Sequence, residues 1–206
     1  MSKSIVAFQH SDTLPAHLVS GGALGNENLT ADDMAVPQLA LIQALSPELK
    51  KSDSKYIQGA SVGHIFNKVT GEVFENVFVV NLKYESMFTI FKKRDQGGGF
   101  EGNHDTFAAA EQHLADNNLV ADHHQIVDTA IHTVACLDAN GLNAKLARIF
   151  MSNSNKKVSD AWNTSIAATE ADRFAKVWAL SSVEETNGKG QGYQVFKATD
   201  AGYASE

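Results

Sequence analysis

The stretch VFVVNLKYESMFTIFKK, Val77 to Lys93, decides the fold class. It is rich in β-branched and aromatic residues, which is typical of a long strand. Apolar residues occupy both alternating faces at its start, with Val77 and Val79 on one and Phe78 on the other. We therefore expect a strand buried on both faces at first and half-exposed from Lys83 onward.

Three hairpins are expected around this strand, over 62–74, 126–151 and 175–198. The first would turn at Val69–Glu72. The second would turn at Asn140-Gly141, which is the strongest short hairpin signal in the chain. Most of the chain is thus predicted to be β structure.

Helical patterns interrupt these strands. Residues 37–45 predict two helical turns that end before Pro47. Residues 105–117 predict a helix with Asp105 as its N-cap. Residues 155–172 predict another, with Trp162 on its apolar side.

The resulting order of hairpin, long strand, helix, hairpin, helix and hairpin fits a small Greek-key barrel. We expect a mainly β, OB-like barrel with helix and loop elaborations, and an α+β fold with one antiparallel sheet is the alternative. The expected organisation is a flexible arm over 1–34, one domain over 35–199 and a frayed end over 200–206.

The composition describes a soluble globular chain. Of the 206 residues, 43% are hydrophobic and 20% charged, so disorder throughout is excluded. No apolar run is long enough for a spanning helix, and the first residues lack the apolar core of a secretory signal. The lone Cys136 excludes an internal disulfide framework and a cysteine-rich zinc site. We expect a cytoplasmic protein, in the host cell if phage-encoded, with no membrane partner.

Charge is unevenly distributed along the chain. The net charge is −7, which argues against a general nucleic-acid sponge. Residues 50–95 nevertheless carry eight basic and five acidic side chains, whereas residues 96–144 carry seven acidic and no basic ones. Such alternation can build a local basic groove, or it can be ordinary solvated charge.

Enzymatic chemistry has weak support. Asp122, His123, His124 and Asp128 have metal-ligating side chains, but their spacing does not force them together, and a solvated loop is the simpler interpretation. The Gly97–Gly99 run lacks the Lys and Ser/Thr of a phosphate loop. Cys136, inside an apolar strand, is expected to be inert. We expect no enzyme, cofactor or metal.

Binding of single-stranded nucleic acid has more support, because it requires basic side chains interleaved with aromatic faces. In the long strand, Tyr84, Phe88 and Lys92 share one face. The other face carries Lys83, Phe91 and Lys93. One face must be core, so one set alone can meet a ligand. The alternative is that the aromatics are all core and the basic residues a solvated strand end.

Two further segments combine charge with an aromatic residue. Lys156 and Lys157 precede Trp162 at the start of a predicted helix, where a phosphate would be favoured, although Trp162 also suits a core position. Lys189 precedes Tyr193 in a glycine-rich hairpin loop of the kind that clamps strands in OB folds. Near Phe100, the glycine run would either bring the backbone close to a ligand or form a plain turn.

A wider pattern accompanies these segments. It comprises GHIFNKVTGEV at 63–73, KRDQGGGF at 93–100, the segment 151–163 ending in Trp162-Asn163, Arg173-Phe174-Ala175, Trp178-Ala179-Leu180 and Lys189-Gly190 with Tyr193. In this order they resemble a group of bacteriophage proteins labelled as single-stranded DNA-binding proteins, over roughly residues 35–198. The resemblance implies a role in replication or recombination on exposed single strands, without catalysis. Unlike many such proteins, this chain has no strongly acidic C-terminal tail.

We therefore expect non-catalytic, sequence-tolerant binding of single-stranded DNA. The residues expected to contact it are Lys68, Lys83, Tyr84, Phe88, Phe91, Lys92, Lys93, Arg94, Phe100, Lys156, Lys157, Trp162, Lys189 and Tyr193. Phage replication or recombination proteins and a second copy of the chain are open as further partners. The alternatives are a phage structural or accessory protein that acts through protein contacts, and a metal-dependent nuclease built on Asp122, His123, His124 and Asp128.

Overall fold

The computed structural model describes residues 27, 28, 30, 35–138, 141 and 144–203. The chain divides into two compact units, Met1–Ala35 and Val36–Glu206, and nearly all described residues belong to the second. The predicted flexible N-terminal segment, residues 1–34, therefore lies almost entirely outside the described residues.

The second unit is mainly β. Within the described residues one sheet holds nine strands: β1 Gln38–Leu41, β2 Ile65–Asn67, β3 Val73–Phe74, β4 Val77–Lys92, β5 Gly99–His104, β6 His124–Cys136, β7 Lys145–Ser152, β8 Lys176–Thr186 and β9 Gly192–Tyr203. Its longer helices are α1 Phe107–Asp116 and α2 Lys156–Ala167. All three predicted hairpins are present, although the turn at Asn140-Gly141 falls mostly outside the described residues.

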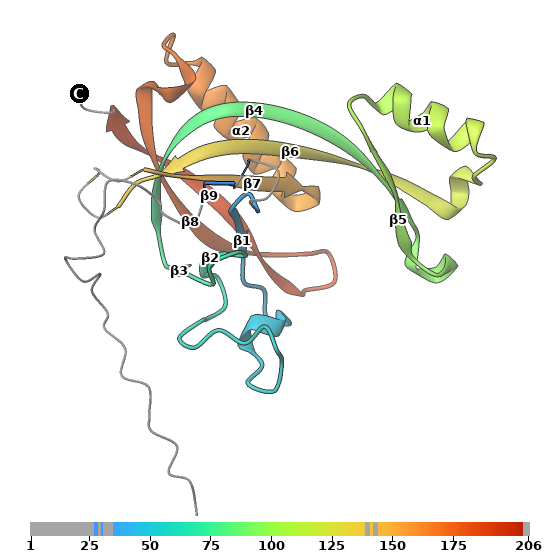
Figure 1. The fold of residues 1–206 in the computed structure, drawn as a ribbon, viewed down its shortest axis with the longest axis horizontal. Helices are drawn as coiled ribbons and strands as arrows, with labels where there is room; N and C mark the ends of the chain where they lie inside the picture. Colours follow the sequence, from blue (N-terminus) through green and yellow to red (C-terminus); the bar gives the residue numbers. More distant parts are fainter. Residues whose placement is uncertain (1–26, 29, 31–34, 139–140, 142–143, 204–206) are drawn as a thin grey trace, which may run out of the picture. The chain divides into compact units, whose positions relative to one another are not determined.

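The strands follow the order β3-β2-β1-β7-β6-β4-β8-β9, with β5 added to the far end of β4. Figure 1 shows this sheet curling strongly into a half-barrel, which confirms the mainly β prediction and is consistent with an OB-like fold. The β1–β7 pair is parallel, and the other neighbours are antiparallel.

The helical prediction for residues 37–45 is wrong, because β1 occupies 38–41. This short apolar segment fits either conformation locally. Its backbone pairs with β2 on one side and with Arg148 and Ile149 of β7 on the other. Those partners satisfy the backbone of four residues that are too few to make a stable helix on their own.

A pair of glutamines links the segment after β1 to the edge strand β9. Gln43, just after β1, donates from Nε2 to the carbonyl of Gln194 in β9 at 2.9 Å. Its Oε1 accepts from the Gln194 N–H at 2.8 Å. The side-chain amide thus replaces a neighbouring strand for one residue of β9. Gly63 lies beside this contact with φ of +87°.

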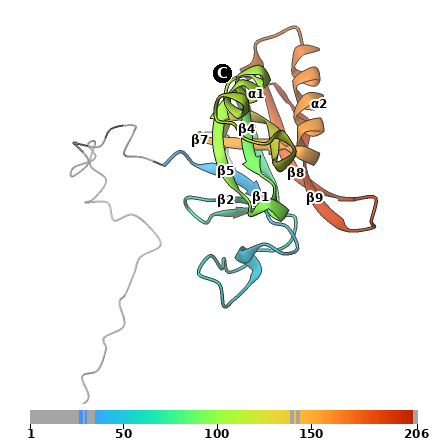
Figure 2. The ribbon, with the colours of Figure 1, turned by 90° about the vertical axis from the view of Figure 1, so that its right-hand side faces the viewer.

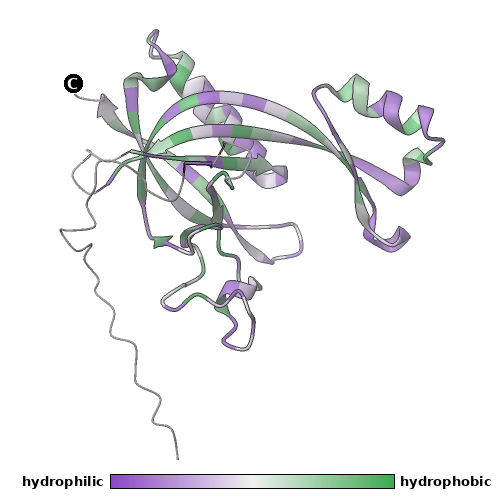
Figure 3. Ribbon diagram, in the orientation of Figure 1, coloured by the Kyte–Doolittle hydropathy of each residue, from purple (hydrophilic) through white to green (hydrophobic). Residues whose placement is uncertain are grey.

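The main core fills the concave side of the half-barrel and is closed by α2. Trp162 and Ile166 of α2 are buried against the sheet, as predicted, and Figure 2 shows the helix alongside β8 and β9. Figure 3 shows apolar and polar residues alternating along several strands, the pattern of a sheet with one buried face. The core residues are Leu39, Ile65, Val77, Val79, Ala130, Val134, Ala147, Ile149, Met151, Trp162, Ile166, Trp178, Leu180 and Phe196.

The far halves of β4 and β6 extend beyond the half-barrel as a paired ribbon that ends in β5 and α1 (Figure 1). We call this part, residues 86–128, the arm. It has a small core of its own, in which Ile90, Ala110 and Leu114 are buried and Phe88 and Ile126 pack against them. β4 therefore contributes to two separate cores.

Several details differ from the sequence prediction. β4 is not buried on both faces at its start, because Phe78 and Leu82 are 48% and 39% exposed. Thr106 rather than Asp105 caps α1, its Oγ1 accepting from the Ala109 N–H at 3.1 Å. β9 continues through Tyr203, so a frayed end does not describe 200–203. No described helix is long and apolar enough to cross a membrane.

Candidate nucleic-acid interface

Tyr84 lies between the half-barrel core and solvent. Its ring centroid is 5.3 Å from that of His132 in β6. The Arg173 guanidinium, in the short 3₁₀ segment η7 (Arg173–Ala175), lies 5.6 Å from the Tyr84 centroid. This cation–π contact holds the cation over the ring face. Tyr84 is thus half-buried, and its ring is in contact with His132 and Arg173.

Arg173 belongs to a polar network that sequence reasoning missed. It donates to Asn81 Oδ1 at 3.2 Å and to Asn163 Oδ1 at 3.0 Å. Asn81 and His132 are both fully buried. In the sequence, Arg173 appears only as part of the segment that resembles phage proteins. No local pattern indicates that it bonds to Asn81, 92 residues earlier.

The two lysines at the start of α2 are neutralised by nearby carboxylates. Lys156 Nζ lies 2.7 Å from Asp160 and 3.4 Å from Asp128. Lys157 Nζ lies 2.6 Å from Glu185. The hydrogen bonds to these carboxylates raise the pKa of each lysine. Their charge therefore offers less to a phosphate than the sequence suggested.

Two predicted stacking residues contribute to the cores, Trp162 as a buried side chain and Phe88 as a half-buried one. Trp162 is 2% exposed, stacks on His132 at 4.6 Å between centroids and meets Trp178 edge-on. The core interpretation of Trp162 is therefore correct in this conformation. Phe88 packs in the arm core, edge-on to Phe107 with centroids 6.0 Å apart.

The tip of the arm brings the exposed aromatic and basic residues together. Phe91 and Phe100 are 37% and 61% exposed, and their ring centroids are 6.2 Å apart. They pair across β4 and β5, after a register shift between Ile90 and Phe91. Here the turn between the strands passes through the short η4 segment, Arg94–Gln96, and the Gly97–Gly99 run. Positive φ at these three glycines lets the chain reverse there.

Three consecutive cations, Lys92, Lys93 and Arg94, follow Phe91 directly. Lys93 Nζ donates to the Asp122 carbonyl at 2.7 Å, which ties the tip to the start of β6. Within the described part of the chain, neither Lys92 nor Arg94 has a carboxylate in salt-bridge range. The tip is thus the predicted segment in which exposed aromatics and unpaired cations adjoin in the sequence, although Lys92 lies on the face of β4 opposite Phe91 and Arg94 lies in the turn.

The remaining predicted residues lie on other elements. Lys83 pairs with Glu85 at 2.8 Å. Lys68 stands in the β2–β3 turn and Lys189 in the β8–β9 turn, both exposed. The Tyr193 hydroxyl donates to Glu185 at 3.0 Å. The structure does not gather these four residues with the arm tip into one surface.

The residues of the nuclease alternative are also dispersed. Among the described residues, no group of three or more histidine, cysteine or acidic side chains is placed to hold a metal ion. His124 and Asp128 are four residues apart on β6, a separation of about 13 Å along a strand. His124 bonds to the Val120 carbonyl, and Asp128 pairs with Lys156.

These observations define a mainly β protein with a curled half-barrel and a projecting arm. Comparison with known protein families identifies it as a bacteriophage protein. The model of the Pam3 phage gp34-like protein family matches residues 9–206, so the chain belongs to that family. No curated protein and no solved structure matches the chain.

Proposed function

We propose that this phage protein binds single-stranded DNA without catalysis, and that the arm tip makes the principal contact. The observation that carries the proposal is the exposed Phe91–Phe100 pair adjoining Lys92 and Arg94. Aromatic faces stack on any base, and adjacent cations meet the backbone phosphates. Such binding would serve phage DNA replication or recombination in the host cytoplasm.

The ion pairs of the half-barrel reduce the number of cations free to contact phosphates, and so reduce the expected salt dependence of DNA binding. Eight basic side chains in contact with phosphates would give a slope of log affinity against log salt of roughly −6 on single strands. Lys83, Lys156 and Lys157 are held by carboxylates instead. With two or three cations at the tip, we expect a slope of about −2.

The test is fluorescence anisotropy with a labelled oligonucleotide of about 30 nucleotides, single-stranded beside double-stranded. Phe91→Ala with Phe100→Ala should weaken single-strand binding by about tenfold or more, because stacking contributes about 1–3 kcal/mol per base. Lys92→Ala with Arg94→Ala should weaken binding and reduce the salt slope by about 1 to 2.

Lys145→Ala with Lys197→Ala is the matched control. It removes two exposed cations from β7 and β9 that have no carboxylate partner among the described residues. This variant should bind like the parent protein. An equal loss of DNA affinity in the control and the tip variant would show that the tip is not the principal contact. If the parent protein binds no single-stranded DNA at about 50 mM salt, the DNA-binding proposal is wrong.

A second candidate is a phage structural or accessory protein that acts through protein contacts. It is favoured by the pairing of Lys83, Lys156, Lys157 and Lys176 with carboxylates, which leaves the half-barrel without a broad basic surface. Light scattering after size-exclusion chromatography would support it if the protein forms a defined oligomer and binds no DNA at any salt concentration.

A further inference from the structure

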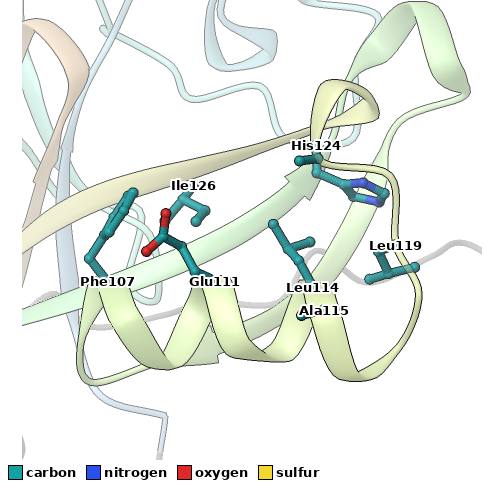
Figure 4. Close-up of a pocket in the computed structure, with 8 residues that line it drawn as sticks. Phe107, Glu111, Leu114, Ala115, Leu119, His124 and Ile126 are labelled. Atoms are coloured by element: carbon teal, nitrogen blue, oxygen red, sulfur yellow. The ribbon is translucent and has the colours of Figure 1, made fainter.

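A second surface of the arm is an apolar groove between α1 and the start of β6 (Figure 4). Its volume is about 530 Å³. It is lined by Phe107, Leu114, Ala115, Leu119, Ala121 and Ile126, together with the polar residues Glu111 and His124. Phe107 at one end is 47% exposed, although it is a large apolar side chain. Exposed apolar surface of this kind marks an interaction site in many soluble proteins.

His124 is an incompletely satisfied member of this lining. It is 8% exposed, and its Nδ1 donates to the Val120 carbonyl at 2.7 Å. Its Nε2 is buried and has no hydrogen-bond partner. The nearest carboxylate oxygen, on Glu101, is 3.9 Å away, beyond hydrogen-bond range. A buried polar atom without a hydrogen-bond partner destabilises a folded protein, so a bound group that hydrogen-bonds to His124 Nε2 would be stabilised there.

The charged side chain that lines the groove is acidic. Residues 96–144 contain seven acidic side chains and no lysine or arginine. Glu111 lines the groove, and Asp116 is exposed five residues further along α1, on another side of the helix. The cations Lys92 and Lys93 do not line the groove but lie at its β6 end, where Lys92 pairs with His124 and Lys93 bonds the Asp122 carbonyl. The α1 side of the groove therefore favours a cationic group over a phosphate.

We infer that this groove binds a basic amphipathic segment of a partner protein. An apolar side chain of that segment occupies the space between Leu114, Leu119 and Ile126, and its lysine or arginine residues pair with Glu111 and neighbouring carboxylates. The groove chemistry matches helix-in-groove recognition, in which apolar anchors supply affinity and flanking charges select the partner. This inference does not rest on DNA binding, which we propose for Phe91 and Phe100.

The probe is a fluorescein-labelled helical peptide of leucine and lysine, about 14 residues long, with its leucines on one face. Two comparison peptides replace the leucines by serine or the lysines by glutamate. Full-length protein is titrated into each peptide, and backbone NMR shifts map the contact. The leucine–lysine peptide should bind, with shifts at Ala115, Leu119 and His124. The serine and glutamate peptides should bind at least about tenfold more weakly.

Two variants test the groove, each with a matched control. Glu111→Lys should weaken peptide binding by about tenfold, and Glu184→Lys, on exposed β8, should leave it nearly unchanged. Ala115→Trp fills the groove and should also block binding. Ala109→Trp adds the same side chain at an exposed position of α1 that does not line the groove, and should not.

Three results would overturn the inference: no peptide binding at about 1 mM protein, equal loss in Glu111→Lys and Glu184→Lys, or displacement of the peptide from the groove by single-stranded DNA. Phe91→Ala with Phe100→Ala separates this inference from the DNA proposal. That variant should retain peptide binding whether or not it loses DNA.

Discussion

Asn81 donates a hydrogen bond from Nδ2 to Nδ1 of His132 across 2.9 Å, and both side chains are fully buried. Arg173 must donate to the amide oxygen of Asn81, so the nitrogen of that amide faces the histidine. His132 Nδ1 is then an acceptor, and its Nε2–H donates to Ser159 Oγ at 2.8 Å. This series of hydrogen bonds joins β4, β6, α2 and η7 through one neutral imidazole.

The neutral state of His132 predicts an acid-sensitive fold. Burial, and secondly the Arg173 charge, lowers the pKa of His132 to about 4. The unfolded chain would protonate this residue near pH 6.5. As pH falls from about 6.5 to 4, the unfolded state alone takes up the proton, so the free energy of unfolding should fall by up to about 3 kcal/mol.

Urea unfolding at intervals between pH 7 and 4 measures this loss, with His132→Gln as the comparison. The variant should be less stable at pH 7, since its amide does not reproduce the imidazole geometry, but its stability should fall less steeply with acid. Parallel pH profiles for the two proteins would contradict the assignment to His132.

Arg173→Met should destabilise the fold and shift the titration of His132. The change leaves Asn81 Oδ1 and Asn163 Oδ1 without their donor, at a cost of about 1–3 kcal/mol. It also removes a positive charge that lowers the pKa of His132. That pKa should therefore rise, while staying below 6.5 because burial, the larger cause, persists. NMR titration of the His132 ring measures the shift, and an unchanged or lower pKa would contradict it.

Gly63→Ala should destabilise the fold more than Gly59→Ala. Both glycines have positive φ, +87° and +82°, which costs any other residue about 1–2 kcal/mol. At Gly63 a Cβ would also lie 2.8 Å from Ser182 Oγ, whereas at Gly59 it meets nothing within 4 Å. The difference in unfolding free energy should be about 1–3 kcal/mol. Adding Ser182→Ala should recover part of it; no recovery would mean that the contact is not the cause.

Leu114→Ala should loosen the arm and leave the half-barrel intact. Leu114 belongs to the small core with Ile90 and Ala110, which shares no residue with the main core. Hydrogen exchange should speed up in the arm, by an amount equivalent to about 2 kcal/mol, and remain slow in β7 and β8. Leu180→Ala, in the main core, is the converse control. Uniform acceleration in the Leu114 variant would show that the two cores unfold together.

Most strand positions could be predicted from local pattern because alternation and turn residues are local properties, but β5, Gly99–His104, has no such alternation and was not predicted. The long β4 strand and the second hairpin follow from Val77–Lys93 and from the apolar runs on each side of Asn140-Gly141. β1 could not be predicted in this way. A four-residue apolar segment fits either helix or strand, and its state is decided by β2 and β7, which lie far away in the sequence.

The candidate site was less predictable, because β4 serves two cores. Strand alternation predicts that Tyr84 and Phe88 share one face, but Tyr84 packs against the half-barrel core and Phe88 against the arm core. Register shifts near Asn81 and Ile90 also interrupt simple alternation. The partners of Lys157 and Arg173 are separated from them by 28 and 92 residues, so no local signal indicated them.

The pairing of β4 with β6 gives the arm a modular character. Ser86 lies opposite Ala130 where the two strands leave the half-barrel, and β6 begins to pair with β7 at Thr129. The polypeptide thus departs and returns at adjacent positions, so the arm is a cassette carried on one hairpin. Exchange of residues 86–128 as one segment would add, remove or replace both proposed contact surfaces together, while the half-barrel kept its strand order.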